Sequence, residues 1–243
     1  MSGLNVLIVG TGQMGAAIAE QLRGRNHQIV AEVGSQGDQQ GRSLVDVCNA
    51  DGETIDIAIE FSLPEAAHEN VKTILDARIP VVCGTTGWQP ESLEPVANEN
   101  GVALLHAANF SIGVAVMKKA TELMSRAFRP FPDFEPAMFE RHHNRKKDAP
   151  SGTAKMLGQV VEEHSSCDNL QITSVRQGCI AGEHSLIFEG QAESLEIVHR
   201  AHSRQIFAIG AVLAAEWLAG EELQGLVDFE SFLERSLQWK TVV

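Results

Sequence analysis

Apolar and polar positions alternate along the first hundred residues in the rhythm of strands followed by helices. Short apolar runs typical of buried parallel strands cover residues 4–9, 28–33, 55–61, 80–83 and 102–105. After the first run, apolar residues recur at helical spacing at Met14, Ala17, Ile18 and Leu22. Strands that alternate with helices over short connections predict a parallel, doubly wound sheet, with ligands at the carboxyl ends of its strands.

One helix start can be predicted from local chemistry. Ser62-Leu63-Pro64-Glu65 has the S-x-x-E spacing of a capping box, in which serine and glutamate side chains satisfy free N–H groups of the backbone. Proline suits the first turn because its missing N–H group is not needed there. We therefore expect a helix to begin at this segment.

The pattern changes after Ser111. A helix over about residues 114–127 is followed by a proline-rich break, a strand that leads into a basic loop, and a helix that starts near Thr153. Alternating strands follow, including residues 183–188 and 195–198, and an apolar helix covers 207–218. This order predicts a second, smaller α+β domain, and the last helix could return to the first domain.

Composition narrows the class of protein. The chain has 243 residues, enough for one large domain or two modest ones, and a hydrophobic fraction of 44% that is normal for a globular protein. No apolar run approaches the ~18–20 residues needed to cross a bilayer, and the start lacks the basic region of a signal peptide. We therefore expect a cytoplasmic enzyme that does not bind membranes.

Charge and cysteine spacing exclude further classes. The four cysteines are widely spaced without a C-x-x-C pair, so neither a disulfide framework nor a metal site is expected. The formal net charge of −13 argues against a nucleic-acid partner. Against this acidic background, the basic run over residues 141–147 is either a solvated loop or a pocket for an anionic substrate.

A G-x-G-x-x-G motif lies between the first strand and the first helix, in the context that a dinucleotide site requires. Its glycines permit a tight turn and close approach of the backbone, so that a pyrophosphate can lie on the helix N-terminus. The predicted cofactor-binding residues here are Gly10, Thr11, Gly12, Gln13, Met14 and Gly15.

The end of the second strand bears on the choice of cofactor. A Rossmann site usually has an acid about 20 residues after the glycines that binds the adenosine ribose. Here Glu32 lies within the strand, its end carries Gly34 and Ser35, and Asp38 lies beyond. A neutral end, with Arg25 or Arg42 nearby, would admit a 2′-phosphate, so the expected cofactor is NADPH and/or NADH.

Two more segments follow strands at the expected cofactor edge of the sheet. Glycine and threonine after the fourth strand offer backbone and hydroxyl groups to ribose or nicotinamide, or else form an ordinary turn. After the fifth strand, Asn109 could bind the carboxamide and Phe110 could flank the ring. The predicted contacts are Gly84, Thr85, Thr86, Ala107, Ala108, Asn109 and Phe110.

The string from Glu140 to Ala154 carries the most chemistry. Paired histidines beside lysines can supply a proton and positive charge near neutral pH. Ser151-Gly152-Thr153 then opens a predicted helix, whose free N–H groups can bind a carboxylate. Protonation and carboxylate capture are thus predicted from one segment.

At this point the chain resembles the dihydrodipicolinate reductase family. The resemblance rests on the string E-x-H-H-x-x-K-x-D-x-P-S-G-T-A, which is preceded by G-x-G-x-x-G, G-T-T-G and A-x-N-F-S-x-G-V. These motifs stand in the family's order from Gly10 to Arg204. The resemblance implies the reduction of 4-hydroxy-tetrahydrodipicolinate, or its dehydrated form, to tetrahydrodipicolinate in lysine and diaminopimelate biosynthesis. Two departures are a short glycine loop and Gly34 in place of the acid.

The resemblance also implies roles for residues. His142 would be the proton donor and acceptor, Lys146 a second proton donor, and His143 a substrate contact. Ser151, Gly152 and Thr153 would hold a carboxylate of a small cyclic dicarboxylate. Residues 1–110 with 204–243 would form the Rossmann-type dinucleotide-binding domain, and residues 111–203 the substrate-binding and oligomerisation domain of a homotetramer.

Two other functions remain open on the sequence. Another two-domain Rossmann oxidoreductase, similar to aspartate or homoserine dehydrogenase, explains the first domain equally well but leaves the His-His-Lys string without a purpose. A nucleotide-sensing regulator on the same fold would need a DNA-binding module or a basic face. Activity on the amino acid instead of the cyclic imine would identify a dehydrogenase of the aspartate or homoserine type.

Overall fold

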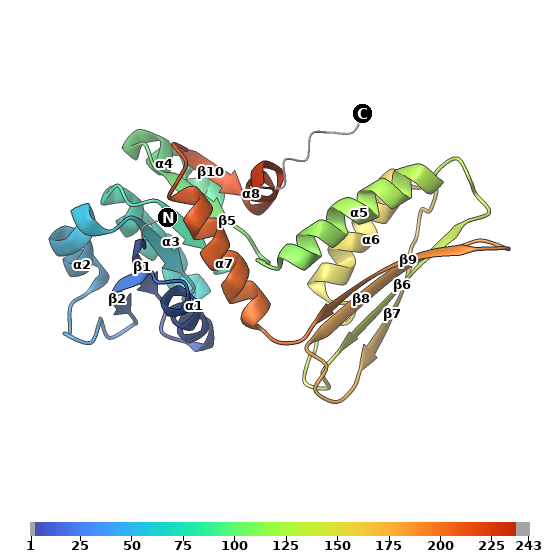
Figure 1. Cartoon of the computed structure of the whole chain (residues 1–243), viewed down its shortest axis with the longest axis horizontal. Coiled ribbons are helices and arrows are strands. Elements are labelled where there is room, and N and C mark those ends of the chain that lie inside the picture. Colours follow the sequence, from blue (N-terminus) through green and yellow to red (C-terminus); the bar gives the residue numbers. More distant parts are fainter. Residues whose placement is uncertain (1–2, 237–243) are drawn as a thin grey trace. The chain divides into compact units, whose positions relative to one another are not determined.

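The protein's structure is a computed structural model that describes residues 3–236 (Figure 1). Backbone contacts group the chain into two compact units: the first runs to Phe110 and resumes at Gln205, and the second is Ser111–Arg204. Residues 237–243 of the expected dinucleotide-binding domain lie outside the described residues. None of the described helices is long and apolar enough to span a membrane.

The first unit is built on a six-stranded sheet in which all pairs are parallel. In the order β10-β5-β4-β3-β1-β2, it contains β1 (Asn5–Val9), β2 (Gln28–Val33), β3 (Ile57–Glu60), β4 (Val81–Cys83), β5 (Ala103–His106) and β10 (Gly225–Asp228). The chain moves to opposite sides of β1 when it forms β2 and then β3. Ligands of doubly wound sheets bind at such a reversal, outside the carboxyl ends of the strands.

Helices cover both faces of this sheet: α1 (Gln13–Gly24), α2 (Leu44–Asp51), α3 (Pro64–Asp76), α4 (Glu94–Asn100), α7 (Gln205–Leu218) and α8 (Phe229–Ser236). α1 packs against α7, and α3 packs against α2 and α4. Leu7 and Val9, which share one face of β1, lie in a buried cluster with Val47, Ile74 and Ala97 of α2, α3 and α4. The continuous burial of β1 and β3 follows, since helices shield both faces.

The second unit places two helices on one face of a four-stranded sheet (Figure 1). The sheet, in the order β7-β6-β8-β9, contains β6 (Glu135–His142), β7 (Gln171–Arg176), β8 (Gly182–Glu189) and β9 (Ser194–Ala201), and the helices are α5 (Ile112–Phe128) and α6 (Gly152–His164). β6 pairs in parallel with β7 and antiparallel with β8. Met138, Leu157 and Leu186 are fully buried between the two layers.

The predicted fold class is confirmed, and one local prediction is wrong. Pro64 begins α3 as expected, but Leu63 is the N-cap and makes no side-chain cap. The Ser62 hydroxyl instead donates to the buried Glu60 carboxylate and accepts a hydrogen bond from Asn70 at 3.0 Å. Because the Ser62 hydroxyl binds the Glu60 carboxylate, it does not cap the start of α3. The sequence analysis named no helix or strand at α2, α4, β10 or α8.

Candidate active site

The glycine loop between β1 and α1 gives each glycine a separate structural role. Gly10 has φ of +104°, a conformation that side chains disfavour. A methyl group at Gly15 would collide with the Gly10 carbonyl oxygen, so Gly15 permits close packing of α1. Gly12, the N-cap of α1, is exposed to open space, as a pyrophosphate requires. The loop residues between them are exposed or half-buried: Thr11, Gln13 and Met14.

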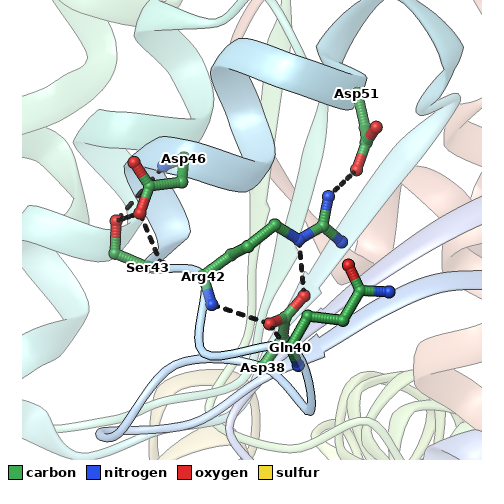
Figure 2. A network of polar contacts seen from close by, with 6 residues as sticks. All are labelled: Asp38, Gln40, Arg42, Ser43, Asp46 and Asp51. Atoms are coloured by element: carbon green, nitrogen blue, oxygen red, sulfur yellow. Dashed lines mark hydrogen bonds and ion pairs between the residues drawn. The ribbon is translucent and has the colours of Figure 1, made fainter.

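An ion-pair network holds the loop after β2, residues 34–43 (Figure 2). The Asp38 carboxylate accepts hydrogen bonds from the backbone N–H groups of Gln40 at 2.9 Å and Arg42 at 2.8 Å, and from Arg42 Nε at 2.8 Å. Arg42 Nη1 also donates to Asp51 at 2.6 Å. Two carboxylates therefore share one guanidinium beside the expected ribose position.

The structure gives a steric reason for the missing acid. A Cβ atom at Gly34 would lie 2.7 Å from the Thr11 hydroxyl oxygen, so an acidic side chain there would crowd the glycine loop. Arg25 precedes β2 at the strand's amino end, opposite to Gly34, and donates to Glu216 through Nε at 2.7 Å and Nη2 at 2.6 Å. Of the two arginines considered, only Arg42 lies in the loop after β2.

The segments after β4 and β5 reach the same edge of the sheet as the glycine loop, because the strands are parallel. Gly84 packs on the Phe61 ring, where a Cβ atom would collide, and the buried Thr85 hydroxyl accepts the Ser62 N–H group at 2.9 Å. Phe110 is only 2% exposed and packs against Phe61 and Phe229. Its side chain belongs to the core, and its carbonyl group packs on Gly210, so the expectation that the Phe110 ring flanks the nicotinamide is not met. The other residues predicted here are half-buried or exposed: Thr86, Ala107, Ala108 and Asn109.

In the second unit, strand register assembles a polar row beneath the helices. Glu140 of β6 pairs with Ser174 of β7 and His184 of β8, and His184 pairs with His199 of β9. His142 lies two residues after Glu140, so both side chains share the buried face of β6. Ionisable groups are rarely buried unless they are paired.

Glu140 is the centre of this row. It is fully buried, forms an ion pair with Nδ1 of His142, and accepts a hydrogen bond from Arg176 Nη2 at 2.6 Å. Burial alone would raise the pKa of Glu140, but the hydrogen bond from Arg176, the nearby Ser174 hydroxyl and the charge of His142 lower it to about 2. Glu140 is therefore a carboxylate at physiological pH.

His142 is held by that carboxylate. Because Nδ1 contacts Glu140, it carries the proton donated to the carboxylate, and Nε2 is the ring nitrogen left for chemistry. Nε2 lies beside Gly182, where a Cβ atom would be only 3.1 Å away. Burial lowers the pKa of His142, and Glu140 opposes that change by raising it. The ring is thus poised to release a proton readily.

The loop after β6 is anchored to the same cluster. Arg176 Nη2, which binds Glu140, also donates to the Asp148 carbonyl oxygen at 2.5 Å. Lys146 forms an ion pair with Asp148 at 2.8 Å, and its charge is near enough to lower the pKa of His142 after the larger effects of burial and Glu140. His143 is half-buried in the same loop. The structure therefore brings Lys146 near His142, and His143 follows His142 in the same loop.

The start of α6 treats its three predicted residues differently. Ser151 is buried and its hydroxyl accepts the Ala154 N–H group at 3.2 Å as the helix cap. Gly152 is exposed and a Cβ atom there would face open space, whereas Thr153 is half-buried. The exposed first turn has the N–H groups that a carboxylate needs.

Sequence reasoning missed three members of the site. Glu140 stood in the motif, and the two-residue strand period that places it with His142 could have revealed it. Arg176 and His184 reach the cluster only through pairing with β7 and β8, for which local sequence gives no signal.

Three of these groups have the spacing of metal ligands. Glu140, His142 and His184 place ligand atoms within 4.8 Å of one another. However, Arg176 and His142 already occupy the two oxygens of Glu140. A cation would have to compete with this guanidinium, so the cluster suits proton chemistry better than metal binding.

Comparison with known families covers nearly the whole chain. The model for "Dihydrodipicolinate reductase, N-terminus" matches residues 4–110, and that for "Dihydrodipicolinate reductase, C-terminus" matches residues 113–233. The 4-hydroxy-tetrahydrodipicolinate reductase of Christiangramia forsetii is 35% identical over 228 residues, which is 88% of this chain and 92% of the relative. That of Natronomonas pharaonis is 35% identical over 254 residues, 93% and 99% of the two chains.

Solved structures share the fold at lower identity. A dihydrodipicolinate reductase from Paenisporosarcina sp. TG-14 with bound dipicolinate superposes with a TM-score of 0.75 at 23% identity, covering 93% of this chain and 97% of the other. An engineered D-amino acid dehydrogenase bound to NADP+ gives a TM-score of 0.58 at 10% identity, covering 99% and 98%.

Proposed function

The chain belongs to the dihydrodipicolinate reductase family, and from this premise we propose that it reduces 4-hydroxy-tetrahydrodipicolinate, or its dehydrated form, to tetrahydrodipicolinate. The reaction is a step of lysine and diaminopimelate biosynthesis. The observation that carries the proposal is the buried Glu140–His142 pair beside the exposed first turn of α6. It joins a proton donor to a carboxylate site, which a cyclic dicarboxylate requires.

The first unit would hold the nicotinamide cofactor. The glycine loop fits a pyrophosphate because Gly12 leaves open space at the N-terminus of α1. Gly84 to Thr86 and the backbone from Ala107 to Phe110 lie at the same edge and would hold the nicotinamide end. The reduced nicotinamide supplies a hydride to an electron-poor carbon of the substrate ring.

The second unit would supply the proton that must accompany the hydride. Nε2 of His142 would deliver it, while Glu140 holds the opposite nitrogen and stabilises the positively charged ring. Lys146 would offset the negative charge that develops on the substrate and serve as a second proton donor, which requires its ammonium to share or leave Asp148. His143 would contact the substrate from the same loop.

The start of α6 would bind a carboxylate of the substrate. The N–H groups of Gly152 and Thr153 and the dipole of α6 would hold one carboxylate of the ring. The family relative with bound dipicolinate supports this substrate class, since dipicolinate is itself a cyclic dicarboxylate. Aspartate or homoserine dehydrogenase-like activity is not favoured by the family to which the chain belongs.

For the cofactor we propose that NADH is accepted at least as well as NADPH. Asp38 and Asp51 together offset the charge of Arg42, so a 2′-phosphate near this loop gains little attraction (Figure 2). Asp51→Asn should weaken this neutralisation and raise kcat/KM for NADPH relative to NADH. Equal ratios in wild type and variant would remove Arg42 from the choice of cofactor.

For the assembly we propose a homotetramer joined through the sheets of the second unit. α5 and α6 cover only one face of that sheet. On the opposite face, Phe139 and Val175 are exposed by 47% and 37%. Exposed apolar side chains on an uncovered sheet face are typical of subunit interfaces.

Steady-state kinetics test the function directly. We expect oxidation of NADH and NADPH that depends on ring substrate generated by the preceding synthase, and no reduction of NAD+ by aspartate or homoserine. Amino-acid-dependent reduction of NAD+ without activity on the ring would instead identify the alternative dehydrogenase.

A further inference from the structure

A histidine outside the proposed proton transfer ties the first turn of α6 to the sheet. The Ser151 hydroxyl oxygen lies 3.1 Å from Nε2 of His184 on β8, in addition to its contact with the Ala154 N–H group. Ser151 is 2% exposed and His184 is 4% exposed. The hydroxyl therefore faces the sheet and is shielded from water.

This hydroxyl has two hydrogen-bond partners. Its oxygen accepts the Ala154 N–H group, and it forms a second hydrogen bond with Nε2 of His184. Burial, followed by the charge of His142, lowers the pKa of His184 to about 4, so the ring is neutral near pH 7. Ser151 is thus held on two sides, by the helix backbone and by the sheet.

The residue that follows Ser151 in the first turn is exposed. Gly152 is exposed to open space. The first residues of a helix have N–H groups without partners inside the helix, and at α6 Ser151 takes that of Ala154. The carboxylate site is therefore the backbone beyond the capping serine, and its direction depends on how the serine is held.

The geometry points to His184 as a positioning residue, which holds Ser151 and thereby orients the N–H groups of Gly152 and Thr153 toward a carboxylate of the substrate. This inference rests on the proposed function and assigns Ser151 a role in holding the helix start, with His184 as its support. The same arrangement recurs at α5, where the capping Ser111 lies 3.4 Å from Nε2 of His199 on the adjacent strand β9.

Calorimetric titration with pyridine-2,6-dicarboxylate, in saturating NADH, tests the inference on the full-length protein. His184→Leu and Ser151→Ala should each raise the Kd about fivefold, the usual effect of a lost helix cap. The double variant should bind no more weakly than Ser151→Ala, since both changes break one connection. His184→Gln, whose amide can replace Nε2, should recover most of the affinity.

Kinetics separate positioning from general damage. KM for the ring substrate should rise in His184→Leu by about the same factor as the Kd, while KM for NADH stays near wild type. His164→Leu, at the C-terminal end of the same helix, is the matched control and should keep the wild-type Kd. If His184→Leu does not fold, His184→Gln and Ser151→Ala still test the prediction.

Three results would overturn the inference: wild-type affinity in folded His184→Leu or in Ser151→Ala, effects that multiply in the double variant, or an equal loss in His164→Leu. Failure of the proposed function is distinguishable because it would appear in the wild-type protein, as absence of both ring reduction and dicarboxylate binding. Failure of the inference alone would appear only in the variants.

Discussion

At the scale of single residues, the candidate site is a buried carboxylate that controls a histidine. Glu140 remains ionised because Arg176 and Ser174 stabilise its negative charge, and it fixes Nδ1 of His142. The pKa of His142 results from two opposed effects, burial that lowers it and Glu140 that raises it. A change in burial or the loss of Glu140 should therefore shift the pKa of His142, and with it proton transfer, in a predictable direction.

We expect His142→Gln to lower kcat by about 10²–10⁴-fold, the usual contribution of general acid catalysis, with a much smaller rise in KM. The side chain donates the proton after substrate has bound, so its loss affects chemistry more than binding. Steady-state rates with saturating cofactor measure both constants. An unchanged kcat would exclude His142 from proton transfer.

Replacement of the carboxylate should shift the pH profile. Protonated His142 is the active form, so kcat/KM should fall as pH rises through its pKa, which burial holds below the usual value for histidine. Glu140→Gln removes the group that raises this pKa, so the falling limb should move to lower pH. A limb that stays in place, or moves to higher pH, would show that Glu140 does not act on His142.

The residue scale also shows what local sequence can reveal. The paired histidines and Ser151-Gly152-Thr153 were recognisable because proton donors and a helix start stood within one string. The inward direction of the Ser151 hydroxyl could not be recognised from the sequence, because its partner His184 is brought close only by the pairing of β6 with β8. The capping box at Ser62 failed for a similar reason, since a buried carboxylate competes for the hydroxyl.

At the scale of elements, the glycines at the junction of β1 and α1 have different roles. Gly15 serves packing because its Cα lies against the Gly10 carbonyl, whereas Gly12 serves the ligand because it faces open space. From its position between a strand and a helix, the sequence motif predicted a tight turn and a pyrophosphate site, but not the packing role of Gly15. The motif could not predict the steric reason for glycine at position 34, because the crowding side chain, Thr11, is distant in sequence.

These two glycines give a matched pair of variants. Gly15→Ala should destabilise the fold by about 1–3 kcal/mol, because the methyl group overlaps a backbone carbonyl. Gly12→Ala should keep the wild-type melting temperature but weaken NADH binding on the order of tenfold, since its methyl group enters the pyrophosphate space. Thermal unfolding and fluorescence titration measure the two effects. Wild-type NADH affinity in Gly12→Ala would argue against a pyrophosphate at this helix.

At the scale of the whole molecule, strand-helix alternation predicted the doubly wound sheet, and the helix near the end of the chain was expected to return to the first domain. α7 packs on α1 in the first unit. The sixth strand, β10, was not predicted because Gly225–Asp228 is a short segment without a long apolar run. It pairs in parallel with β5 and extends the sheet.

The uncovered sheet face leads to a prediction on assembly. Phe139→Glu combined with Val175→Glu should convert the proposed tetramer to smaller species, because each subunit would bring two negative charges to the interface and lose its apolar contacts there. Light scattering after size exclusion measures the mass. Leu123→Glu, at an apolar position on α5 that is 70% exposed, is the control and should leave the mass unchanged.

The most direct measurement is the distance from His142 and Lys146 to a ring bound with NADH and pyridine-2,6-dicarboxylate, in a crystal structure of the ternary complex. We predict Nε2 of His142 and the Lys146 ammonium beside the ring, with one carboxylate on the N–H groups of Gly152 and Thr153. A ring bound elsewhere, with both side chains directed into solvent, would contradict the proposed mechanism.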